Sequence, residues 1–341
     1  MALLWIDGFE QYNTVAQILD VYDSTQSVGV TSQTGRNTGG GNNKCVEIDF
    51  NNSTLIKNIP ESTATIVVGF AWNQATSGVG AQDLLRLYNE GTEMIVLRKD
   101  SSGELLVDRG ATNLGTSSGL GLLAQTWYYI ELKVFIHDST GTVDVWVDGV
   151  NELTLTSQDT KNGTPNTITR VYLVGTAFDW QYDDYYILDD SGSDNTDRLG
   201  DSRVETVFPD ADGNANDFTR VGGGSNNYEA VDDGGTPDDD TTYNHSSTAT
   251  DQELYGFAAL AGSIDTVFAV QACMRVRKEE TGERLIRTVA RSNVTEVESG
   301  DLSLGAGYRY KFGMYENDPD GGGNWDEAAV NAAQFGIAIQ S

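Results

Sequence analysis

WYYIELKVFIHDSTGTVDVWVDG, residues 127–149, is the stretch that decides the fold. Apolar residues occupy every second position from 128 to 136 and again from 143 to 147, and Glu131, Lys133 and Asp144 are among the residues between them. This period of two predicts two strands, each with one apolar and one more polar face. The polar segment 137–141 ends in glycine, which favours a hairpin between the strands, and Asp148-Gly149 predicts a turn into a third antiparallel strand.

Segments of the same alternating kind recur along the chain at a spacing of about ten residues and are separated by turns that contain glycine. This spacing is typical of a β-sandwich. Asn324, followed three residues later by Glu327, has the form of a capping box and predicts one short helix at 325–333. We therefore predict an all-β protein with one short helix.

The chain has 341 residues, which is enough for two domains that each bury a core. A polar, turn-rich stretch without periodicity at 191–201 predicts a linker. It would join a β-sandwich at 1–190 to a smaller β-sandwich at 202–341. The second domain would open with a short strand at 202–208, and a long acidic loop would follow at 209–251.

The net charge is −30, and it arises from 51 acidic and 21 basic residues. Such a surface repels nucleic acid, so we expect no nucleic-acid partner. No run of 18 apolar residues occurs, so we expect no membrane insertion. The first residues lack a basic start and a cleavage site, which predicts synthesis without a signal peptide and retention in a cytoplasm.

The sequence offers few candidates for catalysis. A glycan-cleaving sandwich needs two acids that face one groove, and Glu47-Ile48-Asp49 comes closest to this pattern, with Asn52 where a third acid would stand. The two histidines, His137 and His245, lie in expected loops without a nucleophile motif around any serine. We predict no catalytic and no cofactor-binding residue.

The segment 210–217 places Asp and Asn at alternate positions around Gly213, which suits a calcium loop. The twelfth position, however, is Val221 where a bidentate Glu would be needed, and ordinary turn chemistry explains the same residues. No metal ligand is therefore assigned, and calcium stays an open alternative. The two cysteines, Cys45 and Cys273, lie too far apart in the chain for a disulfide framework, and we expect two buried free thiols.

Exposed aromatic residues could form a platform for sugars. Trp146 lies on the polar face of its predicted strand and is the first candidate, followed by Trp72 and Trp180. The alternative is that a second sheet or a neighbouring subunit covers this face.

Two resemblances follow from the residues. WYYIEL at 127–132, VDVWVDG at 143–149 and DDYYILD at 183–189 resemble the strand pattern of the concanavalin A-like (laminin-G-like) superfamily. This resemblance implies a jelly-roll sandwich over 1–190 and fixes no activity.

The second resemblance covers nearly the whole chain. The segments 184–204, 227–243 and 315–336 are similar to a family of tailed-bacteriophage virion proteins. It implies a non-enzymatic structural protein on the particle, in the capsid decoration or the tail, that assembles with itself and other virion proteins in the host cytoplasm. Two alternatives remain: a carbohydrate-binding adhesion protein of the tail that contacts a host surface glycan, and, ranked last, a glycan-cleaving enzyme.

Overall fold

The structure is a computed structural model that describes residues 2–24, 29–31, 35–36, 43–49, 53–78, 80–262 and 264–341. The chain forms two compact units, which we call unit 1 (Met1–Val204) and unit 2 (Glu205–Ser341). The expected linker at 191–201 belongs to unit 1.

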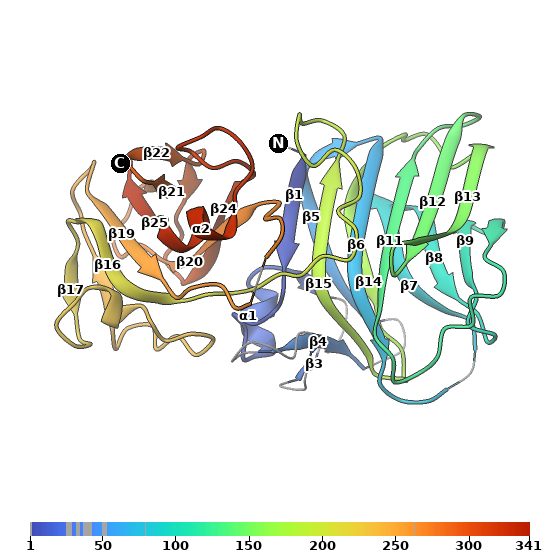
Figure 1. The fold of residues 1–341 in the computed structure, drawn as a ribbon, viewed down its shortest axis with the longest axis horizontal. Helices are drawn as coiled ribbons and strands as arrows, with labels where there is room; N and C mark the ends of the chain where they lie inside the picture. Colours follow the sequence, from blue (N-terminus) through green and yellow to red (C-terminus); the bar gives the residue numbers. More distant parts are fainter. Residues whose placement is uncertain are drawn as a thin grey trace. The chain divides into compact units, whose positions relative to one another are not determined.

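Unit 1 consists of two antiparallel sheets that face each other (Figure 1). Sheet A has, in spatial order, β13 (Val150–Gln158), β12 (Gly141–Val147), β11 (Tyr128–Phe135), β6 (Thr65–Gln74), β15 (Trp180–Asp189), β4 (Cys45–Ile48) and β3 (Gly29–Thr31), and β1 (Leu3–Asp7) also pairs with β15. Sheet B has, in spatial order, β10 (Thr112–Thr116), β9 (Leu105–Arg109), β8 (Thr92–Lys99), β7 (Gln82–Asn89), β14 (Ile168–Val174), β5 (Thr54–Thr63) and β2 (Asp23–Ser24). The predicted all-β fold class is confirmed.

The hairpin predicted from residues 127–149 is confirmed, and its strands are β11 and β12. Ile130 pairs with Val147 and Val134 with Val143, so the apolar positions of both strands share one face. Asp148 and Gly149 have φ angles of 49° and 80° and lead into β13. Positive φ at both central residues is what a tight hairpin turn requires, and it accounts for the Asp-Gly pair.

Aromatic side chains fill the space between the two sheets. Phe70 of β6 lies against Tyr182 of β15, with 5.6 Å between the ring centroids. The Tyr182 hydroxyl donates to the carbonyl oxygens of Leu84 and Val174 in sheet B, at 3.0 and 2.6 Å. The tyrosine ring therefore joins the two sheets, and its hydroxyl is satisfied although it is fully buried.

The short helix α1 (Val15–Leu19) in unit 1 was not predicted from the sequence. Thr14 caps it, and the Thr14 and Gln17 side chains bond each other's backbone N–H groups in a capping box. The Thr14-x-x-Gln17 signal was present, but five residues are too few to show a helical period. No helix in the described part of the chain is long and apolar enough to cross a membrane.

Unit 2 is built on sheet C. Its strands, in spatial order, are β16 (Pro209–Asn216), β19 (Gln252–Phe257), β25 (Gln334–Ile339), β21 (Leu285–Ser292) and β22 (Thr295–Glu298), and β23 (Leu302–Ser303) also pairs with β21. Beside it stand the pairs β17 (Thr219–Val221) with β18 (Tyr243–His245) and β20 (Val270–Val276) with β24 (Arg309–Tyr315), the turn η1 (Tyr228–Ala230) and the helix α2 (Glu327–Ala332). Tyr315, Trp325 and Phe335 form the centre of the core.

Three predictions for unit 2 need correction. The helix α2 is capped by Asp326, whose side chain accepts the N–H of Ala329, because Asn324 is still extended and bridges to Asn317. The start of the expected loop at 209–251 forms β16, an edge strand of sheet C. Residues 202–208 form no strand, and the N–H of Val204 donates to the side chain of Asp184.

Gly69 of β6 lies under the ring of Tyr186, and a Cβ placed there would come within 2.1 Å of the ring. We expect Gly69→Ala to lower the free energy of unfolding of unit 1 by about 1–3 kcal/mol, because the ring must move. Urea denaturation followed by fluorescence measures this, since five of the six tryptophans lie in unit 1. Gly91→Ala, where a Cβ meets nothing within 4 Å, is the matched control. Equal stability of the two variants would contradict the expectation.

Candidate functional site

Polar side chains line the outer face of sheet A, the face turned away from sheet B. Because side chains alternate along a strand, the residues that follow Trp72 and precede Tyr182 point outward, and these are Asn73 and Gln181. Glu131 of β11 points to the same side as Gly69, its partner in β6. Three groups of residues divide this face, and we call them the acid network, the strap and the amide row.

The acid network consists of Glu10, Asp183 and Asp184 together with Arg36 and Arg203. The two aspartates are 0% and 1% exposed, respectively. They lie at an irregularity of β15, where the pairing with β6 shifts register between Asp183 and Tyr186. Asp184 there has a φ of 49°.

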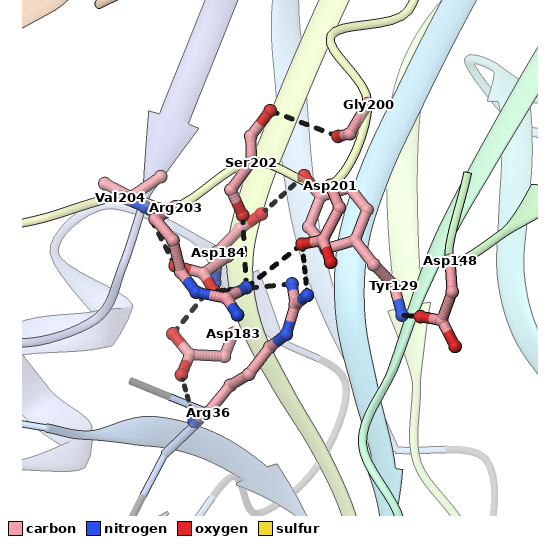
Figure 2. A network of polar contacts seen from close by, with 10 residues as sticks. All are labelled: Arg36, Tyr129, Asp148, Asp183, Asp184, Gly200, Asp201, Ser202, Arg203 and Val204. Carbon is pink, nitrogen blue, oxygen red and sulfur yellow. Dashed lines mark hydrogen bonds and ion pairs between the residues drawn. The ribbon is translucent and has the colours of Figure 1, made fainter. Parts of the chain in front are cut away.

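Figure 2 shows how the two buried carboxylates are held. Asp183 accepts the N–H groups of Arg36 and Asp184, at 2.9 and 2.8 Å. Asp184 accepts the N–H of Val204 at 2.8 Å, and its other oxygen lies 3.3 Å from Nη1 of Arg203 and 3.7 Å from Nη1 of Arg36. Asp184 therefore faces two arginine side chains, which also pair with Asp201, whereas main-chain N–H groups hold Asp183. A further buried acid, Glu10, lies close to Asp183.

Burial changes the protonation of these acids. It raises the pKa of Glu10 to about 10, and the negative charge of Asp183 adds to the effect. Burial also raises the pKa of Asp183, with a further contribution from Asp184, and it raises the pKa of Asp184 although Val204 N–H, Arg203 and Arg36 act against it. The network thus holds at least the Glu10 proton at neutral pH.

The strap is the segment 197–204, which crosses the outer face of sheet A. Asp197 accepts from Nζ of Lys133 at 3.0 Å. Arg198 donates to Glu131 at 3.1 Å, and its guanidinium lies over the ring of Trp146, 5.0 Å from the centroid. The strap ends at Val204, in the acid network.

Glu131 is the buried anchor of the strap. It is 1% exposed, and its Oε1 accepts the hydroxyl of Tyr186 at 2.6 Å and the N–H of Gly200 at 2.8 Å. The same Tyr186 hydroxyl accepts the N–H of Leu199 at 3.1 Å. The carboxylate that the sequence assigns to a polar face is therefore covered by the chain's own strap, and all of these groups are satisfied.

The amide row lies at the other end of the face and runs across three adjacent strands. Asn73 of β6 donates to Oε1 of Gln181 of β15 at 2.9 Å, and Gln181 donates to Oε2 of Glu47 of β4 at 3.0 Å. Asn73 and Gln181 are 9% and 3% exposed, respectively, whereas Glu47 is partly exposed. Two buried amides thus fix the position of one carboxylate that reaches solvent.

Two further acids lie near the amide row. Burial raises the pKa of Glu47 against the bond from Gln181, and the charges of Asp179 and Asp49 raise it further. Asp179 has a φ of 51° and accepts the hydroxyl of Thr76. Glu47 therefore combines a fixed position with an increased affinity for a proton.

The structure places the three candidate tryptophans differently. Trp146 lies on the outer face as predicted, but the strap covers it through Arg198. Trp72 and Trp180 pack edge to face between the sheets, with 5.3 Å between their centroids, and both are buried. They stabilise the core and offer no platform to a sugar.

Glu47 and Asp49 of the Glu47-Ile48-Asp49 motif lie at the end of the outer face of sheet A, and Asn52 lies outside the described residues. His137 accepts two backbone N–H groups of its own hairpin loop through Nδ1, and His245 lies in unit 2. The structure therefore brings no triad together at these histidines.

The calcium segment 210–217 forms most of β16 and is not a loop. Side-chain oxygens of this segment already accept hydrogen bonds: Asp212 accepts the N–H of Tyr228, and Asn216 accepts the side-chain amide of Asn227. Among the described residues, no group of three or more His, Cys, Asp or Glu side chains is arranged to hold a metal ion. Neither cysteine forms a disulfide, but only Cys45 is buried, and Cys273 is exposed on β20, contrary to the expectation of two buried thiols.

Sequence reasoning missed Glu10, Arg36, Gln181 and the role of Arg198. The only signal was the repeat of polar residues at 181 and 183 in a strand whose other residues are largely apolar or aromatic. Arg36 is 147 positions away from Asp183. No local pattern reports such a contact.

No protein-family model matches the chain, and no curated protein matches it. Solved structures do resemble it. The endo-β-1,4-glucuronan lyase from the fungus Trichoderma reesei has 12% identity and a TM-score of 0.37, over 49% of this chain and 89% of the lyase.

Two further structures are similar. The cellulose-induced protein Cip1 has 12% identity and a TM-score of 0.39, over 54% of this chain and 96% of Cip1. The catalytic domain of a glycoside hydrolase family 131 protein from Coprinopsis cinerea has 13% identity and a TM-score of 0.39, over 59% of this chain and 99% of that domain. The likeness is one of fold, and it agrees with the expected jelly-roll sandwich.

These neighbours overturn one prediction. They include a polysaccharide lyase and a glycoside hydrolase. The interpretation as a non-enzymatic virion structural protein is therefore wrong, and with it the prediction that the chain is not an enzyme. The expected virion location and self-association stay predictions.

The acid network predicts how stability depends on pH. Carboxyl groups with a raised pKa bind more protons in the folded than in the unfolded chain, so stability falls as pH rises from about 4 through the folded pKa values. We expect Asp183→Asn to reduce the fall in the melting temperature of unit 1 between pH 5 and pH 9, even if the variant is less stable throughout.

Thermal unfolding followed by tryptophan fluorescence measures this slope. Asp138→Asn, at a side chain that is 67% exposed, is the control and should keep the wild-type slope. If the melting temperature of Asp183→Asn changes with pH as that of the wild type does, the pair of Asp183 and Asp184 does not bind an extra proton in the folded chain.

Proposed function

We propose that unit 1 binds a neutral polysaccharide at the amide row. The observation that carries this proposal is that Glu47 reaches solvent while Gln181 and Asn73, both buried, hold it in one position. A carboxylate accepts hydrogen bonds at several lone pairs, and sugar hydroxyls donate them. A carboxylate that is already fixed binds such a donor without the entropic cost of ordering a free side chain.

The charge around the row favours a neutral ligand. Asp49 and Asp179 lie close enough to raise the pKa of Glu47, and the whole chain carries a net charge of −30. A uronate polymer would bring further negative charge to this place and would be repelled. Uncharged hexose or pentose chains meet no such barrier.

A second candidate function, hydrolysis of the bound glycan, is favoured by one observation. Burial and the neighbouring acids raise the pKa of Glu47, as a general acid near neutral pH requires. In such a reaction Glu47 would protonate the glycosidic oxygen as the bond to the anomeric carbon breaks. Asp49 or Asp179 would take a proton from the attacking water.

Gln181→Ala tests the binding site. Removal of the amide frees Glu47 and leaves its Oε2 without the bond at 3.0 Å. We expect about tenfold weaker binding, which corresponds to the loss of one hydrogen bond to a charged group. Affinity electrophoresis through gels that contain laminarin, xylan or galactomannan measures it, and alginate serves as the anionic comparison.

Gln158→Ala is the matched control, because Gln158 is on β13 at the far edge of the same sheet and its amide donates to the carbonyl of Thr156. It should bind as the wild type does. If the wild type binds none of the neutral polysaccharides, or if Gln181→Ala is folded and binds them equally well, the amide row is not a glycan site.

Glu47→Gln separates hydrolysis from binding. The amide keeps the size of the side chain but provides no acidic proton. Release of reducing ends should therefore fall by about 10²–10⁴-fold, a larger loss than the weaker binding that follows from the exchange of the carboxylate for an amide. Glu152→Gln on β13 is the control with the same chemical change. Cleavage by Glu47→Gln at the wild-type rate would contradict the role of Glu47 as the acid.

A further inference from the structure

The strap holds a part of sheet A that has the composition of a binding surface. Beneath it lie an indole ring, a tyrosine hydroxyl and a carboxylate, from Trp146, Tyr186 and Glu131, respectively. Trp146 and Glu131 are direct partners across β12 and β11, so the ring and the carboxylate lie side by side. All three side chains point to the face that also carries the amide row.

The strap contacts each of these groups in the way that a ligand would. The guanidinium of Arg198 lies over the ring of Trp146, and it donates to Oε2 of Glu131 at 3.1 Å. Main-chain N–H groups of Gly200 and Leu199 donate to Oε1 of Glu131 and to the hydroxyl of Tyr186. A pyranose sugar offers the same kinds of contact. Its ring can stack on Trp146, and its hydroxyls can donate to Glu131 and to the hydroxyl of Tyr186.

The strap is also attached in a way that allows it to leave. Its residues 197–204 belong to no strand of sheet A, so its departure breaks no ladder between strands. Three of its contacts are ion pairs with one partner near the surface: the side chains of Arg198, Arg203 and Asp197 are 32%, 43% and 68% exposed, respectively. The buried partners, Glu131 and Asp184, need other hydrogen-bond donors once the strap has left, and water and the hydroxyls of a ligand supply them.

We propose that the strap is a displaceable lid over a second part of the glycan-binding face, formed by Trp146, Glu131 and Tyr186. The inference rests on the proposed function of the amide row. A short neutral glycan occupies the row alone and leaves the strap in place. A longer chain that continues along sheet A competes with the strap for the ring of Trp146 and for the two acceptors, and it binds fully only when the strap has left.

The test uses the full chain and two changes in the strap. Arg198→Ala removes the group over Trp146 and the ion pair with Glu131. Gly200→Pro removes the N–H that Glu131 accepts, and proline cannot adopt the φ of 79° found at this position. The double variant therefore weakens the strap without altering any residue of the sheet. Arg109→Ala, which removes another partly exposed arginine of unit 1 that pairs with Asp159, is the matched control.

The probes are neutral oligosaccharides of two to three and of eight or more sugars, from the polysaccharide that the wild type binds best. Calorimetry should show about tenfold tighter binding of the long probe to the double variant than to the wild type, and unchanged binding of the short probe. Trp146→Ala in the same double variant should remove the gain. The control Arg109→Ala should behave as the wild type does with both probes.

The outcomes separate the two proposals. If the wild type binds the short probe and the double variant binds the long probe no more tightly, the lid is refuted and the amide row stands. A gain that survives Trp146→Ala also refutes the covered site. If the wild type binds neither probe and no neutral polysaccharide, the proposed function itself has failed.

Discussion

The outer face of sheet A contains carboxylates that are buried, and this constraint determines how the rest of unit 1 is arranged. Glu131, Asp183 and Asp184 are each at most 1% exposed, and a buried charge is costly unless it is paired or hydrogen-bonded. The partners come from distant segments of the chain. Arg36 arrives from the segment before β4, and Arg198, Gly200 and Val204 arrive from the strap. The end of unit 1 is thus fixed to the sheet by the need to satisfy three acids.

The same constraint explains why one end of the face differs from the other. Where the strap and Arg36 lie, every acid has a cationic or N–H partner close to it. At the amide row no such segment covers Glu47 among the described residues, and neutral amides hold the carboxylate. Amides orient a carboxylate without neutralising it, so its charge and its affinity for a proton remain available. This difference leaves the carboxylate of the row accessible from solvent, whereas Glu131, Asp183 and Asp184 are buried.

The fold was predictable where the pattern is local, and the site was not. The hairpin of β11 and β12 follows from alternation and from Asp148-Gly149, whose φ angles need these residues. Alternation also places Trp146 on the outer face correctly. It cannot show that Arg198 lies over that ring, because the two residues are 52 positions apart and the strap itself has no periodicity.

Glu47 was singled out by its spacing to Asp49, whereas Gln181, which positions it, is 134 positions away. Short elements failed for a related reason: α1 and β16 are too short or too polar for their period to stand out.

The distribution of charge connects the strap with the kind of ligand. The chain has 21 basic residues against 51 acidic ones, and three of the basic residues, Arg36, Arg198 and Arg203, lie over the outer face of sheet A. Two of these three belong to the strap. The strap also carries Asp197 and Asp201, so its departure leaves the net charge unchanged, but it takes the guanidinium groups away from Glu131 and Asp184 and leaves these acids on the face. An anionic polymer would then bind less well as it displaced the strap, whereas a neutral one would supply hydroxyl donors to the same carboxylate. A lid that carries the cationic partners of these acids therefore favours uncharged chains.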